Sequence, residues 1–260
     1  MAAATQWKAF PHPAKGYLYA GDALKKNWER LHRGDCVPFP KERAAQEAWR
    51  LFHAGRFGEA VAAGLDAGGA GITAANKAQA IYANGVETQE ARRLALFEEV
   101  MKRAEAQAKD DPKDANAHYL YAYAAGRYSQ RISVAKALAQ GYGGKIRAAL
   151  EAAMKLQPKH ADAHIAMGAY HAEIIDKVGA LVGGLTYGAS KERGEEHFRK
   201  AVKLAPDSPV ALIEMANGLV LMHGRKMVEE AGRLYAKAAQ MEPRDAMERL
   251  DVEAARAEID

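Results

Sequence analysis

The sequence predicts an all-α protein made of stacked helical repeats. Four times a helix-like run ends in a proline and another such run follows: EAAMKLQPKHADAHIAMGAY, FRKAVKLAPDSPVALIEMAN, YAKAAQMEPRDAMERLDVEA and, more loosely, AEAQAKDDPKDANAHYLYAY. Self-similarity of this kind is typical of solenoids whose neighbouring repeats bury a shared core. Among the 260 residues, 49% are hydrophobic, and no run alternates as a strand would. We therefore expect a right-handed superhelix of antiparallel helix pairs.

The helix before each proline carries one apolar stripe. Small residues stand five positions before the prolines: Ala153, Ala201 and Ala238. Large apolar residues stand eight positions before them: Leu150, Phe198 and Tyr235. A spacing of three residues places both sets on one helix face, where the small residues allow close approach and the large ones fill the gap. The proline cannot continue the helix and sets the turn into the next one.

Caps and breakers delimit the other elements. After an irregular start over residues 1–21, we expect helices over 22–34, 41–54, 57–66, 73–84, 88–109, 114–126, 132–140, 145–157, 161–181, 190–204, 208–222, 226–241 and 244–259. Asp22, Thr73, Thr88 and Ser190 are N-cap residue types at these starts. Glycine-rich stretches and prolines separate the helices.

Three regions follow from this pattern. Residues 1–40 form an N-terminal extension with one helix, 41–110 form degenerate helical hairpins, and 111–260 form the clear repeats. The proline spacings in the last region exceed the usual repeat length of about 34 residues. The excess is two insertions, RYSQRISVAKALAQGYGG and DKVGALVGGLTYGASKE, each between the two helices of a unit. Such loops often carry function.

The chain resembles the tetratricopeptide (TPR) superfamily, whose repeat is helix A, turn and helix B. When the repeats are aligned by their prolines, PKDANAH and PKHADAH coincide. Ala122, Gly168 and Ala216 then stand at the equivalent position, where the TPR repeat has a small residue. GGKIRAALEAAMKLQPKHADAHIAMGAYHAEI, a glycine-containing insert and EEHFRKAVKLAP resemble the regulator of microtubule dynamics family. A more distant resemblance is to the TPR subunit associated with TRAP-type solute transporters. These resemblances cover about residues 115–222 and imply a protein that is not an enzyme.

Helix A faces line the concave groove of a TPR superhelix. In this frame the groove residues are Asn116, Tyr119, Tyr123, Asp162, Ile165, Ala169, Val210, Ile213 and Asn217. Two tyrosines one turn apart offer a large amphipathic contact area, which is typical of binding hot spots. We therefore expect a non-catalytic scaffold or adaptor that binds a protein or peptide segment in its groove.

Two alternatives remain. In the first, the insertions close the groove into a pocket and the protein carries a small ligand; an enclosed apolar cavity would favour this, whereas exposed tyrosines would favour the adaptor. In the second, the protein is a structural homo-oligomer. Residues 131–205 hold 12 basic and 7 acidic groups, and 206–260 hold 7 and 11, so the basic part of one copy would meet the acidic part of another.

Site chemistry of other kinds is not favoured. His164 and His171 share a helix face, and His118 is the equivalent of His164 in the preceding unit, but no HExxH-type ligand spacing is present, so we expect core or groove-wall histidines and no metal. GYGGK lacks the following Ser or Thr and the preceding strand of a phosphate-binding loop. Cys36 has no activating base beside it. We expect no catalytic residue and no cofactor.

Several partner classes are also disfavoured. The net charge is only +4, and no Lys/Arg run with interleaved aromatics indicates nucleic-acid binding. The longest uncharged stretch, 178–190, is too short for a membrane span. No apolar signal core or lipobox cysteine stands near the start, so we expect a cytoplasmic protein unless a leader has been removed. The positions of the chaperone-binding carboxylate clamp hold other residues: Tyr119, Tyr123, Ala166, Val210 and Glu214.

Overall fold

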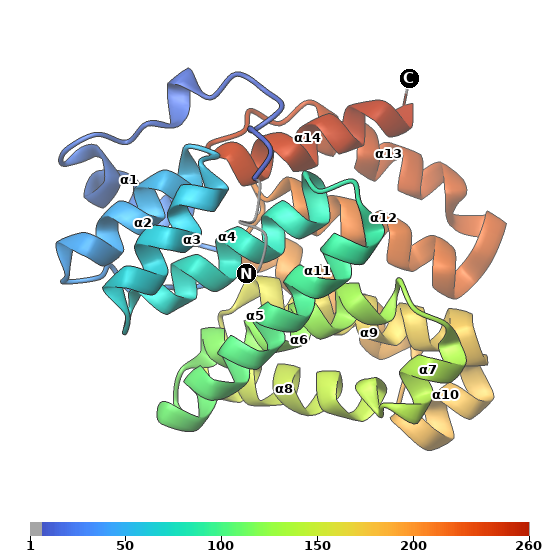
Figure 1. The fold of residues 1–260 in the computed structure, drawn as a ribbon. Helices are drawn as coiled ribbons and strands as arrows, with labels where there is room; N and C mark the ends of the chain where they lie inside the picture. The colour runs from blue at the N-terminus through green and yellow to red at the C-terminus, as the bar shows by residue number, and fades with distance from the viewer. Residues whose placement is uncertain (1–6, 260) are drawn as a thin grey trace.

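The computed structural model describes residues 7–259, which form helices and connecting loops without a strand. The α-helices are α1 (Ala23–Leu31), α2 (Arg43–His53), α3 (Phe57–Ala67), α4 (Gly71–Gly85), α5 (Glu90–Asp110), α6 (Ala115–Ser129), α7 (Val134–Ala139), α8 (Tyr142–Leu156), α9 (Ala161–Val178), α10 (Ala180–Tyr187), α11 (Lys191–Leu204), α12 (Pro209–His223), α13 (Val228–Ala239) and α14 (Ala246–Ile259). Figure 1 shows them stacked as antiparallel pairs. The expected all-α class is confirmed.

The proline-anchored repeats are three helix pairs, α6 with α8, α9 with α11, and α12 with α13. Helix A of one pair packs on helix A of the next, as α9 does on α12, and each helix A packs on its own helix B. The hairpins α2–α3 and α4–α5 precede these pairs, and α14 follows them. The helical-repeat prediction is thus confirmed.

Phe198 of α11 joins two repeats and explains why one of the recurrent small positions is a glycine, Gly168. Its ring is fully buried between α9 and α12. A Cβ added at Gly168 would lie 2.8 Å from this ring, and one at Gly218 would lie 2.3 Å from its Cε2 atom. Because protein interiors are close-packed, glycine is what lets the ring fill this space.

The two insertions contain the short helices α7 and α10. The sequence predicts a linker over residues 141–144, but only Gly141, at φ +67°, lies outside the helix, and α8 begins at Tyr142. The helix expected over 161–181 ends at Val178, because Gly179 adopts φ +82° and turns the chain into α10. Left-handed backbone is readily available to glycine, so each insertion is redirected at a glycine.

Two expected caps are wrong. Thr73 lies inside α4, and Thr88 lies two residues before α5. The buried carboxylate of Glu87 instead accepts hydrogen bonds from the backbone N–H groups of Thr88 and Gln89. By contrast, Ser190 caps α11 through its side chain, as expected.

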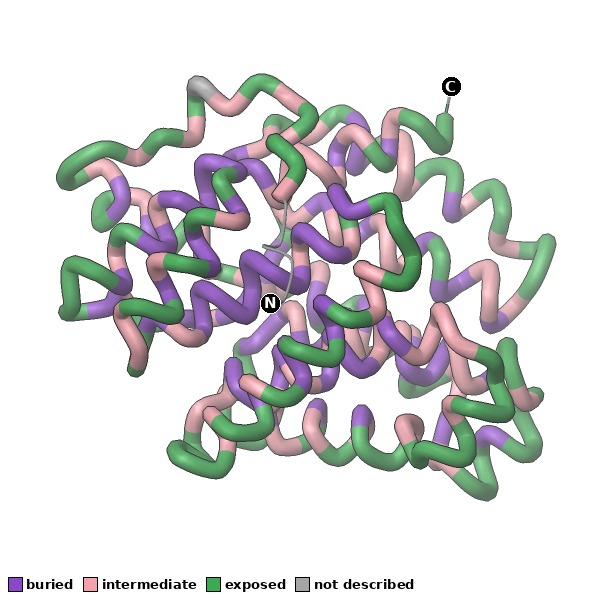
Figure 2. Tube along the Cα trace, in the orientation of Figure 1, coloured by how far each residue is buried: buried purple, intermediate pink, exposed green. Residues whose placement is uncertain are grey.

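The N-terminal region wraps around the first hairpins and reaches the repeats. Helix α4 is buried along most of its length (Figure 2). The loop after α1 passes close to α9, where the Asp162 N–H donates to the Gly34 carbonyl at 3.0 Å. Within residues 7–259, no helix has the length and apolar character needed to cross a bilayer.

Candidate functional site

A cavity of about 610 Å³ occupies the concave side of the repeats. Its walls come from α6, α9 and α12, which are helix A of the three clear pairs, together with α4 and α14. Side chains of α7, α8 and α10 line one end. The volume lies within the range of about 300–1,000 Å³ that is usual for small-molecule sites.

Most of the residues expected in the groove line this cavity: Tyr119, Tyr123, Asp162, Ile165, Ala169, Val210 and Ile213. Two do not. Asn116 is buried beside the N-terminal loop and donates to the Asp35 carbonyl at 3.0 Å. Asn217 accepts from the Tyr235 hydroxyl at 2.6 Å. Their side chains satisfy contacts outside the cavity, which the helix A frame does not reveal.

The cavity is long. Its lining runs along α9 from Asp162 to Val178, a span of about 24 Å at 1.5 Å per residue. A site of this length suits an elongated ligand.

The cavity walls are predominantly apolar, and most of their polar groups already have partners. Apolar side chains come from all five wall helices: Ile81, Leu120, Ile165, Ile174, Val210, Ile213, Met247 and Leu250. Arg127 donates to Glu214 at 2.5 Å, which joins α6 to α12. On α9, Glu173 pairs with Lys177 at 3.2 Å and accepts from Gln130, the residue just after α6, at 3.1 Å.

Among the polar groups in the wall, Tyr119 and Asp251 are two that a ligand could reach. The Tyr119 hydroxyl forms no hydrogen bond within residues 7–259, and burial raises the pKa of this phenol well above its usual value. Burial, reinforced by the nearby carboxyl groups of Glu248 and Asp245, raises the pKa of Asp251 well above its usual value. The raised pKa values favour the neutral form of both groups, and a protonated carboxyl group can donate a hydrogen bond.

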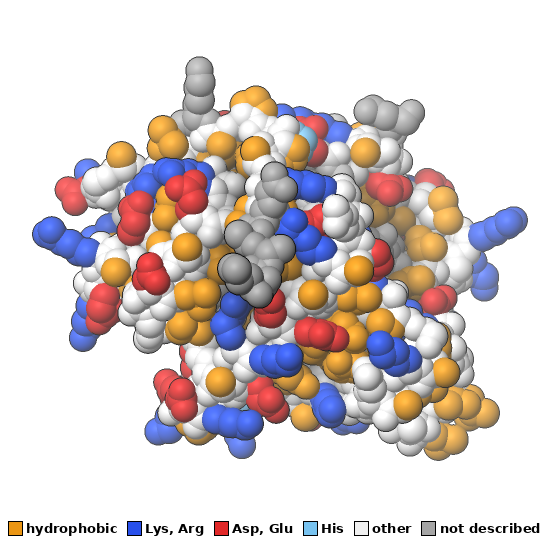
Figure 3. Space-filling model, in the orientation of Figure 1, with side chains coloured by type: hydrophobic (Ala, Val, Ile, Leu, Met, Phe, Trp, Pro, Cys, Tyr) orange, Lys and Arg blue, Asp and Glu red, His pale blue; other side chains and the backbone are white. Residues whose placement is uncertain are grey.

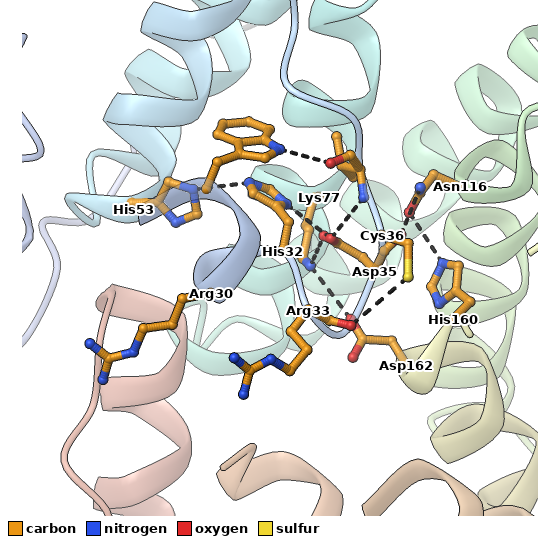
Figure 4. Close-up of polar contacts among 12 residues, drawn as sticks. Arg30, His32, Arg33, Asp35, Cys36, His53, Lys77, Asn116, His160 and Asp162 are labelled. Atoms are coloured by element: carbon orange, nitrogen blue, oxygen red, sulfur yellow. Dashed lines mark hydrogen bonds and ion pairs between the residues drawn. The ribbon is translucent and has the colours of Figure 1, made fainter. Parts of the chain in front are cut away.

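A buried charge cluster forms one end of the cavity (Figure 4). Lys77 of α4 lies between two carboxylates, 2.5 Å from Asp35 Oδ2 and 3.5 Å from Asp162 Oδ2. Lys77 and Asp162 also line the cavity, whereas Asp35 belongs to the N-terminal loop. Because buried charges are costly unless they are paired, this cluster holds the N-terminal loop against α4 and α9.

A relay of imidazoles extends the cluster to α14. His32 Nδ1 lies 2.9 Å from Asp35, His53 Nδ1 lies 2.8 Å from Asp245, and the two Nε2 atoms are 3.2 Å apart. The two imidazoles thus form a continuous buried chain of polar contacts between Asp35 in the N-terminal loop and Asp245 beside α14.

Burial acts on the acids and histidines of this cluster in different directions. Burial raises the pKa of Asp35, but His32 and Lys77 outweigh it, so the pKa lies well below its usual value. For Asp162, burial prevails over Lys77 and the pKa is raised. Burial lowers the pKa of both His32 and His160 to about 4.

We expect His32 and His160 to resist protonation far below their usual range. Their folded pKa of about 4 lies below the ordinary 6.5, so the unfolded state binds more protons between these values. Their contribution to stability is therefore complete above pH 6.5 and is lost as the pH falls towards 4. NMR titration of the imidazole resonances checks this, with the urea-unfolded protein as the reference. Midpoints for both buried rings near pH 6.5 would contradict it.

The structure of residues 7–259 does not support a metal site at the histidines or a reactive thiol at Cys36. His164 and His171 are buried, as expected of core histidines, and His164 Nδ1 lies 2.9 Å from His197 Nδ1. Among residues 7–259, no cluster of three or more His, Cys, Asp or Glu side chains could hold a metal ion. Burial raises the pKa of the Cys36 thiol to about 11, which disfavours a reactive thiolate.

Sequence reasoning missed the wall residues contributed by α4 and α14, among them Lys77, Ile81, Leu250 and Asp251. Helix α4 neither precedes a recurrent proline as helix B nor follows one as helix A. Helix α14 does follow Pro243, and Met247 and Leu250 stand four and seven positions after it. Asn116 and Tyr119 have the same offsets from Pro112, so the same spacing could have identified this face.

Comparison with known proteins agrees with this architecture. A crystal structure described as a thermophilic TPR protein in Thermus thermophilus aligns with a TM-score of 0.58 and 17% identity, covering 83% of this chain and 98% of that chain. At this identity the likeness shows the fold alone. No curated protein sequence matches the chain. The family model described as regulator of microtubule dynamics protein 1-3 matches residues 73–258, from α4 to α14. The chain therefore belongs to the regulator of microtubule dynamics protein family.

Proposed function

We propose that this protein is a non-catalytic carrier that binds one elongated, mainly apolar small molecule in the central cavity. The supporting observation is the cavity itself, which runs along α9 and is lined by apolar side chains from five helices. The tyrosines expected on an open groove are in its walls, and Tyr119 is only 7% exposed. A concave site lined mainly by apolar side chains, with a few polar groups, is typical of ligand sites.

The polar groups of the wall favour an amphiphile, such as a long-chain fatty acid, over an extended peptide. A peptide brings a donor and an acceptor with almost every residue, and each costs free energy when buried without a partner. Here the charged groups in mid-cavity are already paired, as Arg127 is with Glu214. A molecule with an alkyl chain and a single polar end needs only one or two partners, and the Tyr119 hydroxyl and Asp251 are available.

Filling the cavity tests this proposal. Ala169 lies in the α9 wall and is only partly buried, so Ala169→Trp places an indole in the cavity. We expect titration calorimetry with palmitic acid to show binding by the wild type and at least about ten-fold weaker binding by the variant, because the apolar contacts that give affinity are displaced. Ala166→Trp, on the same wall, should act in the same way.

The matched control is Ala148→Trp, an exposed position of α8 outside the cavity lining. It adds the same side chain to a helix and should bind palmitic acid as the wild type does. Circular dichroism and thermal melting establish that all three variants fold. Absence of palmitate binding by the wild type, or equal binding by the wild type and the folded Ala169→Trp and Ala166→Trp variants, would refute the proposal.

An extended peptide segment is the second candidate for the same cavity. It is favoured by the TPR-like fold, because such repeats use their concave surfaces for binding, and by Tyr119 and Tyr123, whose ring centroids are 6.1 Å apart. Selection from a displayed peptide library would test it. If peptides were enriched on the wild type but not on Ala169→Trp, and the wild type did not bind palmitate, the adaptor would replace the carrier as the proposed function.

A further inference from the structure

The inserted helix α10 presents aliphatic side chains to solvent at one corner of the molecule. Leu181 is 77% exposed, Val182 50% and Leu185 82%. Figure 3 shows hydrophobic side chains gathered at the lower right, where Figure 1 places α10. A contiguous apolar patch on a protruding element marks an interaction site more often than it marks chance exposure.

The exposed face of α10 is opposite to the face that packs. Gly183 is buried, and a Cβ added there would meet Ile174 of α9 at 3.0 Å. The Tyr187 carbonyl accepts hydrogen bonds from Tyr170 and Arg147 at 3.2 and 3.1 Å. Leu181 and Leu185 lie two residues before and after Gly183, about 200° around the helix, and therefore point away from the protein.

The flanks of this aliphatic tip are basic. Residues 134–147 and 177–193 together hold six Lys or Arg and one acidic residue, Glu192, whereas the whole chain has a net charge of only +4. Arg147 and Lys177 are paired with Glu151 and Glu173. The remaining basic residues of these segments form no ion pair within residues 7–259: Lys136, Lys145, Lys191 and Arg193. Asp176 is a further exposed acidic residue beside α10.

We infer that α10 docks on an anionic lipid surface, with Leu181, Val182 and Leu185 inserted among the acyl chains and the flanking lysines at the headgroups. Exposed aliphatic side chains can insert at the boundary between headgroups and acyl chains, and anionic headgroups attract the Lys and Arg residues of the flanking segments. Protein-binding hot spots favour Trp, Tyr and Arg, and Leu and Val are under-represented in them. This inference does not depend on the occupant of the cavity.

Vesicle flotation tests this docking. We expect the wild type to float with vesicles of phosphatidylcholine and phosphatidylserine, and to bind pure phosphatidylcholine more weakly. Leu181→Asp/Leu185→Asp should reduce the bound fraction about ten-fold, because it places two charges where acyl chains would lie. Lys145→Glu/Lys191→Glu should weaken binding to the anionic vesicles and abolish the preference for them.

The matched control is Val228→Asp/Ile259→Asp, which changes two other exposed apolar residues, 55% and 49% exposed, on α13 and α14. It should float as the wild type does. The proposal is overturned if the wild type does not bind vesicles, or if the Leu181/Leu185 variant floats equally well. It is also overturned if the leucines are needed for pelleting with microtubules or for self-association in sedimentation velocity but not for flotation. The Leu181/Leu185 variant should retain palmitate binding, which separates this inference from the carrier proposal.

Discussion

Lys77→Met is expected to destabilise the protein by about 3–5 kcal/mol, the usual cost of leaving buried charge without its partner. Lys77 is buried and lies beside both Asp35 and Asp162. Its removal leaves two carboxyl groups in a low-dielectric interior without their shared cation, although Met nearly preserves the volume. For a chain of this size, we expect a decrease in Tm of roughly 10 °C in a thermal melt.

The pH dependence and a control separate lost charge from lost packing. As the pH falls and the unpaired carboxyl groups become protonated, the difference in stability between the wild type and Lys77→Met should shrink. Lys113→Met, at an exposed position with no ion pair within residues 7–259, should change the free energy of unfolding by less than about 0.5 kcal/mol. If Lys77→Met lowered the free energy of unfolding at neutral pH as little as this control does, the charge cluster would not be stabilising the fold.

Phe198→Ala is the second large effect, with an expected loss of about 3–5 kcal/mol. The ring is fully buried between α9 and α12, against Gly168 and Gly218. Neither glycine has a side chain that can move into the space, so the cavity left by the ring stays largely empty. Denaturant unfolding should show the loss as a lower midpoint. The variant should also bind palmitate more weakly, because α9 and α12 form a wall of the central cavity.

The reciprocal change tests the same contact. Gly218→Ala would place Cβ 2.3 Å from the Phe198 ring, and such overpacking costs about 1–3 kcal/mol. Combined with Phe198→Leu, which removes the colliding atoms, it should cost less than the sum of the two single changes. Gly232→Ala in α13, where a Cβ meets nothing within 4 Å, is the control and should be neutral or stabilising. If the double variant Gly218→Ala/Phe198→Leu lost as much stability as the two single variants together, this account of the contact would be contradicted.

The sequence predicted the repeat architecture because its evidence is local. A proline ends each helix B, and Leu150, Phe198 and the small residues near them mark one packed face. The same frame located seven of the nine expected groove residues in the cavity lining. It also identified both insertions, although not α10, because a helical run that is redirected at Gly179 looks like a continuous helix or a loop in the sequence.

The rest of the site depends on contacts between distant residues, which one sequence does not reveal. Lys77 meets Asp35 across 42 positions, and Arg127 meets Glu214 across 87. Asn116 was assigned to the groove by its frame, but the N-terminal loop passes beside it and takes its side chain as a donor. No periodicity encodes such pairings, because they arise only when separate helices are stacked.

The most direct test of the central claim is a crystal structure of the protein grown with palmitic acid. We predict continuous density for the acyl chain inside the central cavity, along α9 between Asp162 and Val178, with the carboxyl group within hydrogen-bond distance of Tyr119 or Asp251. Density confined to the outer face of α10, or an empty cavity at ligand concentrations that saturate binding in solution, would contradict the carrier.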